Sequence, residues 1–176
     1  IYNSENVTVS NSNFSNNYHG IIWGESSYPS VRGMINDTFM ENNLQDGLFI
    51  ITSPNLTLER VTVRNNTDDG ISLASGSDNF TIRHSTVNDN TDNGLDITTA
   101  SNGTIYNTTI FSQEQSSDYG VIINAGSSWN INDSFFRDNN IGLYITGTST
   151  GHRISGNNFT NNTDDGIQFA SNNDYN

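Results

Sequence analysis

Pairs of apolar residues separated by one residue recur along the chain, each just after a glycine. The pairs are Ile21/Trp23, Leu48/Ile50, Ile71/Leu73, Leu95/Ile97, Val121/Ile123, Leu143/Ile145 and Ile167/Phe169, with 22–27 residues between successive glycines. Apolar residues at i and i+2 are typical of a β-strand that buries one face. The hexapeptide NNTDDG also occurs twice, at 65–70 and 161–166. These patterns predict one structural repeat that is present about seven times.

Two further apolar patterns complete each repeat. The second comprises Val7/Val9, Leu56/Leu58, Phe80/Ile82 and Trp129/Ile131, with partial matches at Ile105 and Ile154. The third ends at Phe14, Met40, Val63, Val87, Ile110, Phe136 and Phe159. Three short strands and their turns fill each repeat, and no helical period is visible. We therefore predict an all-β chain: one domain over 1–176, a solenoid of three parallel sheets and about seven coils, roughly 35 Å long at the usual strand spacing.

An amide side chain follows each third-strand marker by three positions. These residues are Asn17, Asn43, Asn66, Asn90, Gln113, Asn139 and Asn162. Stacked one per coil, they can form a hydrogen-bonded ladder that also satisfies the backbone of the turns. The NNTDDG segment is then a corner between strands, where Asn tolerates a tight turn and Gly supplies backbone freedom.

The pattern N-x-F-x-N-N-x-x-D-G-I-x-L, as in 157–168 and 65–73, resembles the right-handed parallel β-helix family of pectin-lyase-like and NosD-like repeat proteins. The resemblance covers nearly the whole chain and implies a right-handed coil. Lyases, hydrolases, epimerases, phage spikes and non-catalytic surface proteins share this pattern. A function must therefore be inferred from a site carried on the solenoid.

Composition limits the classes of molecule that the protein can bind. The chain has 19 acidic and six basic residues, all six of them Arg, and a net charge of −13. This charge disfavours binding to nucleic acid and to anionic membranes. Cysteine is absent, and the longest apolar run, 48–51, is too short to span a bilayer. No leader segment is visible and residue 1 is Ile, so we expect a mature chain or a segment of a longer chain or assembly, located outside the cell.

An acidic corner is the first candidate site. Asp46 and Asp69 occupy one position in successive coils, as do Asp68 and Asp92. Stacking places each pair about 5 Å apart, which can raise a pKa, bind Ca²⁺ or support glycoside hydrolysis. The simpler interpretation, which we favour, is that Asp is a good turn residue that recurs with the repeat.

Basic residues give a second candidate. Glu59-Arg60 aligns with Arg83-His84, and the family's lyases and epimerases use a basic residue to abstract a proton from a uronate. An ion pair between Glu59 and Arg83 explains the same residues without chemistry. If the protein is an enzyme, the candidate catalytic residues are Arg60, Arg83, His84, Asp68 and Asp92. Otherwise no catalytic residue is expected.

The remaining histidines favour structural roles. Gly151-His152-Arg153 resembles the Gly-His-Gly of polygalacturonase-like hydrolases, but their Arg-Ile-Lys is absent, as is the Asp-Pro-His of alginate epimerases. His152 aligns with an inward-facing column. His19 lies in a turn and lacks the spacing of a metal ligand.

Asn-x-Ser/Thr sequons are numerous. They begin at Asn6, Asn13, Asn36, Asn55, Asn65, Asn79, Asn102, Asn107, Asn132, Asn158 and Asn161. Asn6, Asn55, Asn79 and Asn102 all precede the second strand, so they should form a column at one corner. This placement fits a glycosylated secreted protein, although a sequon that recurs with the repeat explains it equally well.

Two classes of function remain. The first is an extracellular structural β-helix of a surface layer, sheath, filament or adhesin, glycosylated and without a cofactor. The second is a carbohydrate-active β-helix, either a polysaccharide lyase or a glycoside hydrolase. Glycans are the expected partners in both. End-to-end association of copies is also expected, because neither terminal coil has a recognisable cap.

Overall fold

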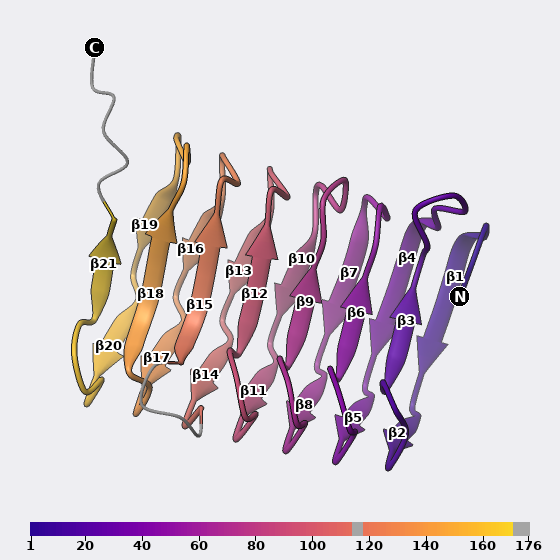
Figure 1. The fold of residues 1–176 in the computed structure, drawn as a ribbon, viewed down its shortest axis with the longest axis horizontal. Helices are drawn as coiled ribbons and strands as arrows, with labels where there is room; N and C mark the ends of the chain where they lie inside the picture. Colours follow the sequence, from indigo (N-terminus) through magenta and orange to yellow (C-terminus); the bar gives the residue numbers. More distant parts are fainter. Residues whose placement is uncertain (114–117, 171–176) are drawn as a thin grey trace.

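The chain folds as a parallel β-solenoid. The computed structural model describes residues 1–113 and 118–170, and Figure 1 shows them winding through successive coils along one long axis. The described residues form 21 strands in three seven-stranded sheets and contain no helix. Each strand pairs in parallel with its equivalents in the adjacent coils, and the strands at the ends of each sheet pair on one side only. The predicted all-β solenoid with three sheets and about seven coils is confirmed.

Each coil supplies one strand to each sheet, and the sheets are named here in chain order. Sheet A contains β1 (Glu5–Ser10), β4 (Val31–Asn36), β7 (Leu56–Glu59), β10 (Thr81–Arg83), β13 (Thr104–Tyr106), β16 (Asn130–Asn132) and β19 (Arg153–Ser155). Sheet B contains β2 (Asn13–Ser15), β5 (Phe39–Glu41), β8 (Thr62–Arg64), β11 (Thr86–Asn88), β14 (Thr109–Phe111), β17 (Phe135–Arg137) and β20 (Asn158–Thr160). Sheet C contains β3 (Ile21–Trp23), β6 (Leu48–Ile50), β9 (Ile71–Leu73), β12 (Leu95–Thr98), β15 (Tyr119–Asn124), β18 (Ile141–Thr146) and β21 (Ile167–Phe169).

The core is a set of apolar columns that run along the solenoid axis. Ile71, Leu95, Val121 and Leu143 are register partners in sheet C, and each is fully buried. This is the column that the post-glycine pairs predict. Because side chains alternate across a strand, the residue between each apolar pair points outward. The sequence of sheet C therefore sets one inner column and one outer column at the same time.

Two tryptophans fill the core beside Gly33, which is in β4 of sheet A, and Gly103, which directly precedes β13. A Cβ atom added to Gly33 would lie 2.0 Å from the Trp23 ring, and one added to Gly103 would lie 2.3 Å from the Trp129 ring. The indole nitrogen of Trp129 donates a hydrogen bond to the Ala100 carbonyl at 2.9 Å. At each glycine, an indole ring thus occupies the space that a side chain would need.

Corners depend on single residues in the left-handed backbone region. Arg60 and His84 (φ 52° each) connect sheets A and B, and Asn65 (φ 54°) begins the connection from sheet B to sheet C. Asn tolerates this conformation better than most residues, which explains the abundance of Asn at corners. Arg60 and His84 therefore occupy turn positions of the coil.

The amide ladder forms as predicted over most of its length. Asn90 Oδ1 accepts hydrogen bonds from the backbone nitrogen of Asn66 at 3.2 Å and from its Nδ2 at 2.9 Å. Asn43 bonds to Asn66 in the same way, and Asn90 bonds to Gln113. These bonds satisfy side chains and turn backbone together.

The ladder has exposed ends and one interruption. Asn17 is exposed and Asn162 is half-buried. No described coil follows Asn162 to cover it. Gln113 directs its Nε2 to the Phe111 carbonyl at 2.9 Å. Within the described residues, the buried Asn139 Oδ1 has no hydrogen-bond partner.

Candidate functional site

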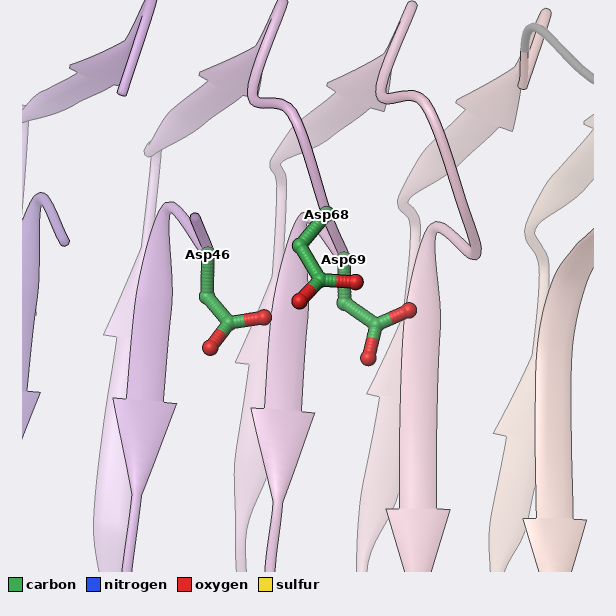
Figure 2. A group of neighbouring side chains, drawn as sticks. All are labelled: Asp46, Asp68 and Asp69. Carbon is green, nitrogen blue, oxygen red and sulfur yellow. The ribbon is translucent and has the colours of Figure 1, made fainter. Parts of the chain in front are cut away.

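Three carboxylates meet where the connections from sheet B enter sheet C. Asp46 precedes β6, while Asp68 and Asp69 precede β9 one coil further along (Figure 2). One oxygen of each lies within 4.8 Å of the others. Asp69 stacks on Asp46 because both stand directly before the corner glycine. The pairing of Asp46 with Asp69 expected from the repeat is therefore present, and Asp68 joins it.

Burial makes two of these carboxyl groups unusual acids. Asp46 and Asp69 expose only 6% and 7% of their surface. Burial, together with the charge of Asp68, raises the pKa of Asp46 to about 7. Burial and the charge of Asp96 raise the pKa of Asp69 to about 8, although its Oδ1 accepts two hydrogen bonds from Asn93, each 3.0 Å long. Asp69 is therefore mostly protonated at neutral pH, and Asp46 titrates near neutral pH.

Further acids extend the cluster along the axis. Asp92 stands one coil after Asp68, and its backbone nitrogen donates to the Asp68 carbonyl at 3.3 Å. Asp96 projects from the outer column of β12 in register with Ser72. Burial is the first cause that raises the pKa of both Asp92 and Asp96. The side chains of Asp46, Asp68, Asp69, Asp92 and Asp96 form what we call the acidic cluster.

Aromatic rings lie on both sides of the acidic cluster along the axis. His19 stacks on Phe49 with ring centroids 5.6 Å apart and planes at 19°. Further along, Tyr119 stacks on Tyr144 at 4.7 Å and 20°. Phe49 and Tyr144 belong to the outer column of sheet C, the same column as Asp96. We call this outer surface, with the cluster and both stacks, the sheet C face.

His19 also contacts the acidic cluster. Its Nδ1 lies 3.3 Å from Asp46 Oδ2, but the angle does not make a hydrogen bond. Burial lowers the pKa of His19, while the charge of Asp68 opposes that shift. Because the pKa of His19 is lowered and the pKa of Asp46 is raised to about 7, the two side chains do not make a strong ion pair at neutral pH.

All six arginines lie away from the sheet C face. Five belong to strands of sheets A and B, namely Arg32, Arg64, Arg83, Arg137 and Arg153, and Arg60 forms a corner between these sheets. The described part of sheet C therefore carries acids without a compensating arginine.

The three basic candidates already have side-chain partners. Arg83 Nη2 lies 2.9 Å from Glu59 Oε2, which is the ion pair that the sequence predicts. Arg60 binds Asp37 through Nε at 2.7 Å and also contacts Glu59. His84 Nδ1 lies 2.8 Å from the Asn107 amide. Arg60, Arg83 and His84 are thus brought close to Glu59 and Asn107, and not to the acidic cluster.

His152 has a packing position. It follows the register of sheet A, and its Nδ1 accepts a hydrogen bond from the Trp129 backbone at 3.4 Å. Burial lowers its pKa. The resemblance of Gly151-His152 to a hydrolase motif therefore marks an inward-facing residue, as the alignment of His152 predicts.

The acidic cluster fits Ca²⁺ only in part. Carboxylate oxygens are suitable ligands for this cation, and Asp46, Asp68 and Asp69 converge closely enough to share one. However, Asp69 Oδ1 is already occupied by two hydrogen bonds from Asn93. Binding a cation would also require Asp46 and Asp69 to lose their protons.

Most sequon asparagines are accessible. Asn36 and Asn132 are half-buried. The other nine, at positions 6, 13, 55, 65, 79, 102, 107, 158 and 161, are exposed. The expected corner column of Asn6, Asn55, Asn79 and Asn102 exists, because the Thr residues two positions later are aligned in sheet A.

Sequence reasoning missed the aromatic part of the sheet C face. His19 was assigned to a turn, and Phe49, Asp96, Tyr119 and Tyr144 were not singled out. The signal was available for Phe49, Asp96 and Tyr144, which each stand two residues after a corner glycine, at the outward position of the strand. The alignment also held a signal for His19 and Tyr119, because both directly precede a corner glycine, at the position of Asp46 and Asp69.

The fold and the sequence place the chain in a known family. The model of the family described as the right-handed β-helix region matches residues 34–176, so the chain belongs to this family. This match confirms the predicted resemblance and the hand of the coil. No curated protein matches the chain.

Solved structures with the same fold are remote in sequence. The A-module of mannuronan C-5 epimerase AlgE6 from Azotobacter vinelandii has a TM-score of 0.72 and 16% identity, over 96% of this chain and 56% of the epimerase module. Tailspike protein 2 of Escherichia coli O157:H7 bacteriophage CAB120 has a TM-score of 0.70 and 16% identity, over 94% of this chain and 24% of its own. Pectate lyase Pel9A has a TM-score of 0.57 and 14% identity, over 73% of this chain and 40% of the lyase. At these identities the likeness concerns the fold, and the chain spans only part of each structure.

The described residues contain no helix that is long and apolar enough to cross a membrane.

Proposed function

We propose that this protein is an extracellular surface β-helix that binds a neutral or amino-sugar polysaccharide along the sheet C face. One observation carries the proposal: a group of carboxyl side chains lies between two stacked aromatic pairs, His19–Phe49 and Tyr119–Tyr144. Aromatic rings offer flat apolar surfaces to the faces of sugar rings, and carboxyl groups exchange hydrogen bonds with hydroxyl groups. The fold neighbours named for mannuronan and pectate make a saccharide the natural class of ligand.

The sheet C face is long enough to contact an extended ligand. Phe49 and Tyr144 stand four coils apart in one outer column, through Ser72, Asp96 and Ile122. Four strand spacings make about 19 Å. A chain molecule lying parallel to the solenoid axis can therefore contact both aromatic pairs and the acids between them, whereas a single sugar can reach only one pair.

Charge selects the class of polysaccharide. The face gathers Asp46, Asp68, Asp69, Asp92 and Asp96, while every arginine lies on sheets A and B or between them. A polyuronate would bring its carboxylates against the ionised members of this cluster and is repelled. A neutral glycan has no such cost, and a protonated amino sugar gains attraction. The proposed ligand thus differs in charge from the polyuronates in the names of the epimerase and the lyase.

Glycoside hydrolysis is a second candidate, favoured by the same carboxyl geometry. Retaining glycosidases hold two carboxyl groups about 5–5.5 Å apart, one protonated and one ionised. Asp69, whose pKa is raised to about 8, can give its proton to the glycosidic oxygen. The half-buried Asp68 can then attack the anomeric carbon, and water releases the sugar from Asp68 in a second step.

The binding experiment compares polysaccharides by charge. Affinity electrophoresis of the purified protein through gels containing a neutral β-glucan, chitosan or polygalacturonate should show retardation in the first two only. Tyr144→Ala should weaken retardation about 2–10-fold, since an aromatic contact contributes roughly 0.5–1.5 kcal/mol. Tyr106→Ala is the matched control, because Tyr106 is an exposed tyrosine on sheet A. Retardation by polygalacturonate alone, or equal loss in both variants, would refute the proposal.

Release of reducing ends separates binding from hydrolysis. If the second candidate holds, the wild-type protein shortens the retained polysaccharide, and Asp69→Asn abolishes cleavage while retardation persists. Retardation without any new reducing ends leaves the binding function and removes the hydrolase.

A further inference from the structure

The side-chain environment divides the sequons into two groups. Four asparagines use their amides in side-chain hydrogen bonds. The amide nitrogens of Asn13, Asn36 and Asn107 bond to Glu41, Asp37 and His84, and the amide oxygen of Asn132 accepts a bond from Ser155. The other seven, at positions 6, 55, 65, 79, 102, 158 and 161, have no side-chain hydrogen bond within the described part of the chain. Only the second group presents amide groups that are free of side-chain hydrogen bonds in the described part of the chain.

Four of the free amides stack in one column at the corner before sheet A. Asn6, Asn55, Asn79 and Asn102 have φ of 56°, 64°, 58° and 60°. Each is exposed, and the Thr of its sequon lies two residues later in sheet A. Their common backbone conformation points the four side chains in the same direction. The column is thus a row of equivalent sequons and not four unrelated ones.

The column has unequal spacing along the axis. Asn55, Asn79 and Asn102 come from successive coils, as the pairing of Thr57, Thr81 and Thr104 shows. Between Asn6 and Asn55 the position is held by Arg32, which is in the same left-handed conformation. Neighbouring sequons are therefore about 4.8 Å apart, whereas Asn6 and Asn55, like Asn55 and Asn102, are about 10 Å apart.

One strand spacing is too narrow for two N-linked glycans. A pyranose ring with its N-acetyl and hydroxyl groups is wider than the distance between adjacent strands, and parallel attachment directions prevent the first sugars from diverging. Two spacings give enough width. A hollow of about 250 Å³ also lies between Asn6 and Asn55, lined by Thr8, Arg32 and Met34. Room for the first sugars is thus present beside Asn6 and Asn55.

We propose that this column is an N-glycosylation site with alternate occupancy, in which two neighbouring coils never both carry a glycan. Asn6, Asn55 and Asn102 are occupied together, and Asn79 is occupied only in molecules where Asn55 and Asn102 are bare. The inference concerns sheet A and is independent of ligand binding on sheet C.

Site occupancies test the proposal. The protein, preceded by a secretion signal, is produced in a eukaryotic host that N-glycosylates, and the folded secreted fraction is cleaved after arginine. Asn55 and Asn79 then lie on separate peptides, 33–60 and 65–83. An Asn65→Gln background leaves Asn79 as the single sequon of its peptide. The occupied fractions of Asn55 and Asn79 should sum to no more than one, as should those of Asn79 and Asn102.

Asn6 and Asn55, which are two strand spacings apart, are the internal control for competition between neighbouring sequons. The fractions at Asn6 and Asn55 should sum to more than one, because these sites do not compete. Asn79→Gln should raise occupancy at Asn55 and Asn102, while Asn13→Gln, which removes a hydrogen-bonded sequon outside the column, should leave both unchanged. A sum above one for Asn55 and Asn79, or a column without glycans, would overturn the proposal.

Discussion

Removing one rung from the middle of the amide ladder should destabilise the protein strongly. Asn90 is fully buried. Its Oδ1 accepts the backbone nitrogen of Asn66 at 3.2 Å and the Asn66 Nδ2 at 2.9 Å, and its own Nδ2 donates to Gln113 at 3.3 Å. Asn90→Ala leaves the Asn66 backbone nitrogen without this acceptor. It also removes one of the two hydrogen bonds of Asn66 Nδ2 and one of the two that Gln113 Oε1 accepts.

The magnitude follows from the donors on Asn66. Each buried donor left without a partner costs about 1–3 kcal/mol. Two donors give roughly 2–6 kcal/mol if both are left unpaired, and roughly half of that if the Asn66 side chain keeps its bond to the Met40 carbonyl. For a chain of this size 1 kcal/mol lowers Tm by about 2–4 °C, so a fall of several degrees is expected.

The assay needs a control from the same column. Urea unfolding followed by tryptophan fluorescence gives the free energy of unfolding of Asn90→Ala and of Asn17→Ala. Asn17 is the exposed end of the ladder, and its side chain makes one long bond, 3.4 Å, to Asn43. Asn17→Ala should cost less than about 1 kcal/mol. Equal, small losses in both variants would refute the view that the buried rungs hold the corner together.

Two more predictions concern stability. Because the pKa values of Asp46 and Asp69 are raised to about 7 and about 8, the folded state binds more protons than the unfolded state above about pH 4, and the free energy of unfolding should fall as pH rises to about 8. Asp69→Asn, which copies the Asn93 of the next coil, should flatten this dependence in urea midpoints measured at pH 5 and 8; a midpoint that rises with pH would contradict the assignment. Gly103→Ala places a Cβ 2.3 Å from the Trp129 ring and should lower the free energy of unfolding by at least about 1–3 kcal/mol. The control Asn130→Ala, on the exposed outer side of β16, should change the urea midpoint little. Equal urea midpoints for the two variants would show that the indole can move aside.

Sequence alone determined the architecture because the solenoid turns sequence separation into spatial contact. Residues 22–27 positions apart become neighbours in the adjacent coil, so a period along the chain is already a list of contacts. The inner column of Ile71, Leu95 and Val121 and the ladder from Asn43 to Gln113 follow from this rule. The ion pair of Glu59 with Arg83 follows from the same alignment.

Tertiary structure decided which polar corners are chemically unusual. The hexapeptide at 65–70 recurs at 161–166, yet Asp69 is buried with a raised pKa while Asp165 is exposed. The difference lies in what the neighbouring coils supply: Asp46 on one side of Asp69, and Asn93 with Asp96 on the other. Burial and Coulomb interaction depend on these surroundings and not on the local letters. The sheet C face was not recognised from the sequence for the same reason. Each of its aromatic pairs joins residues of two adjacent coils, and no single repeat contains both.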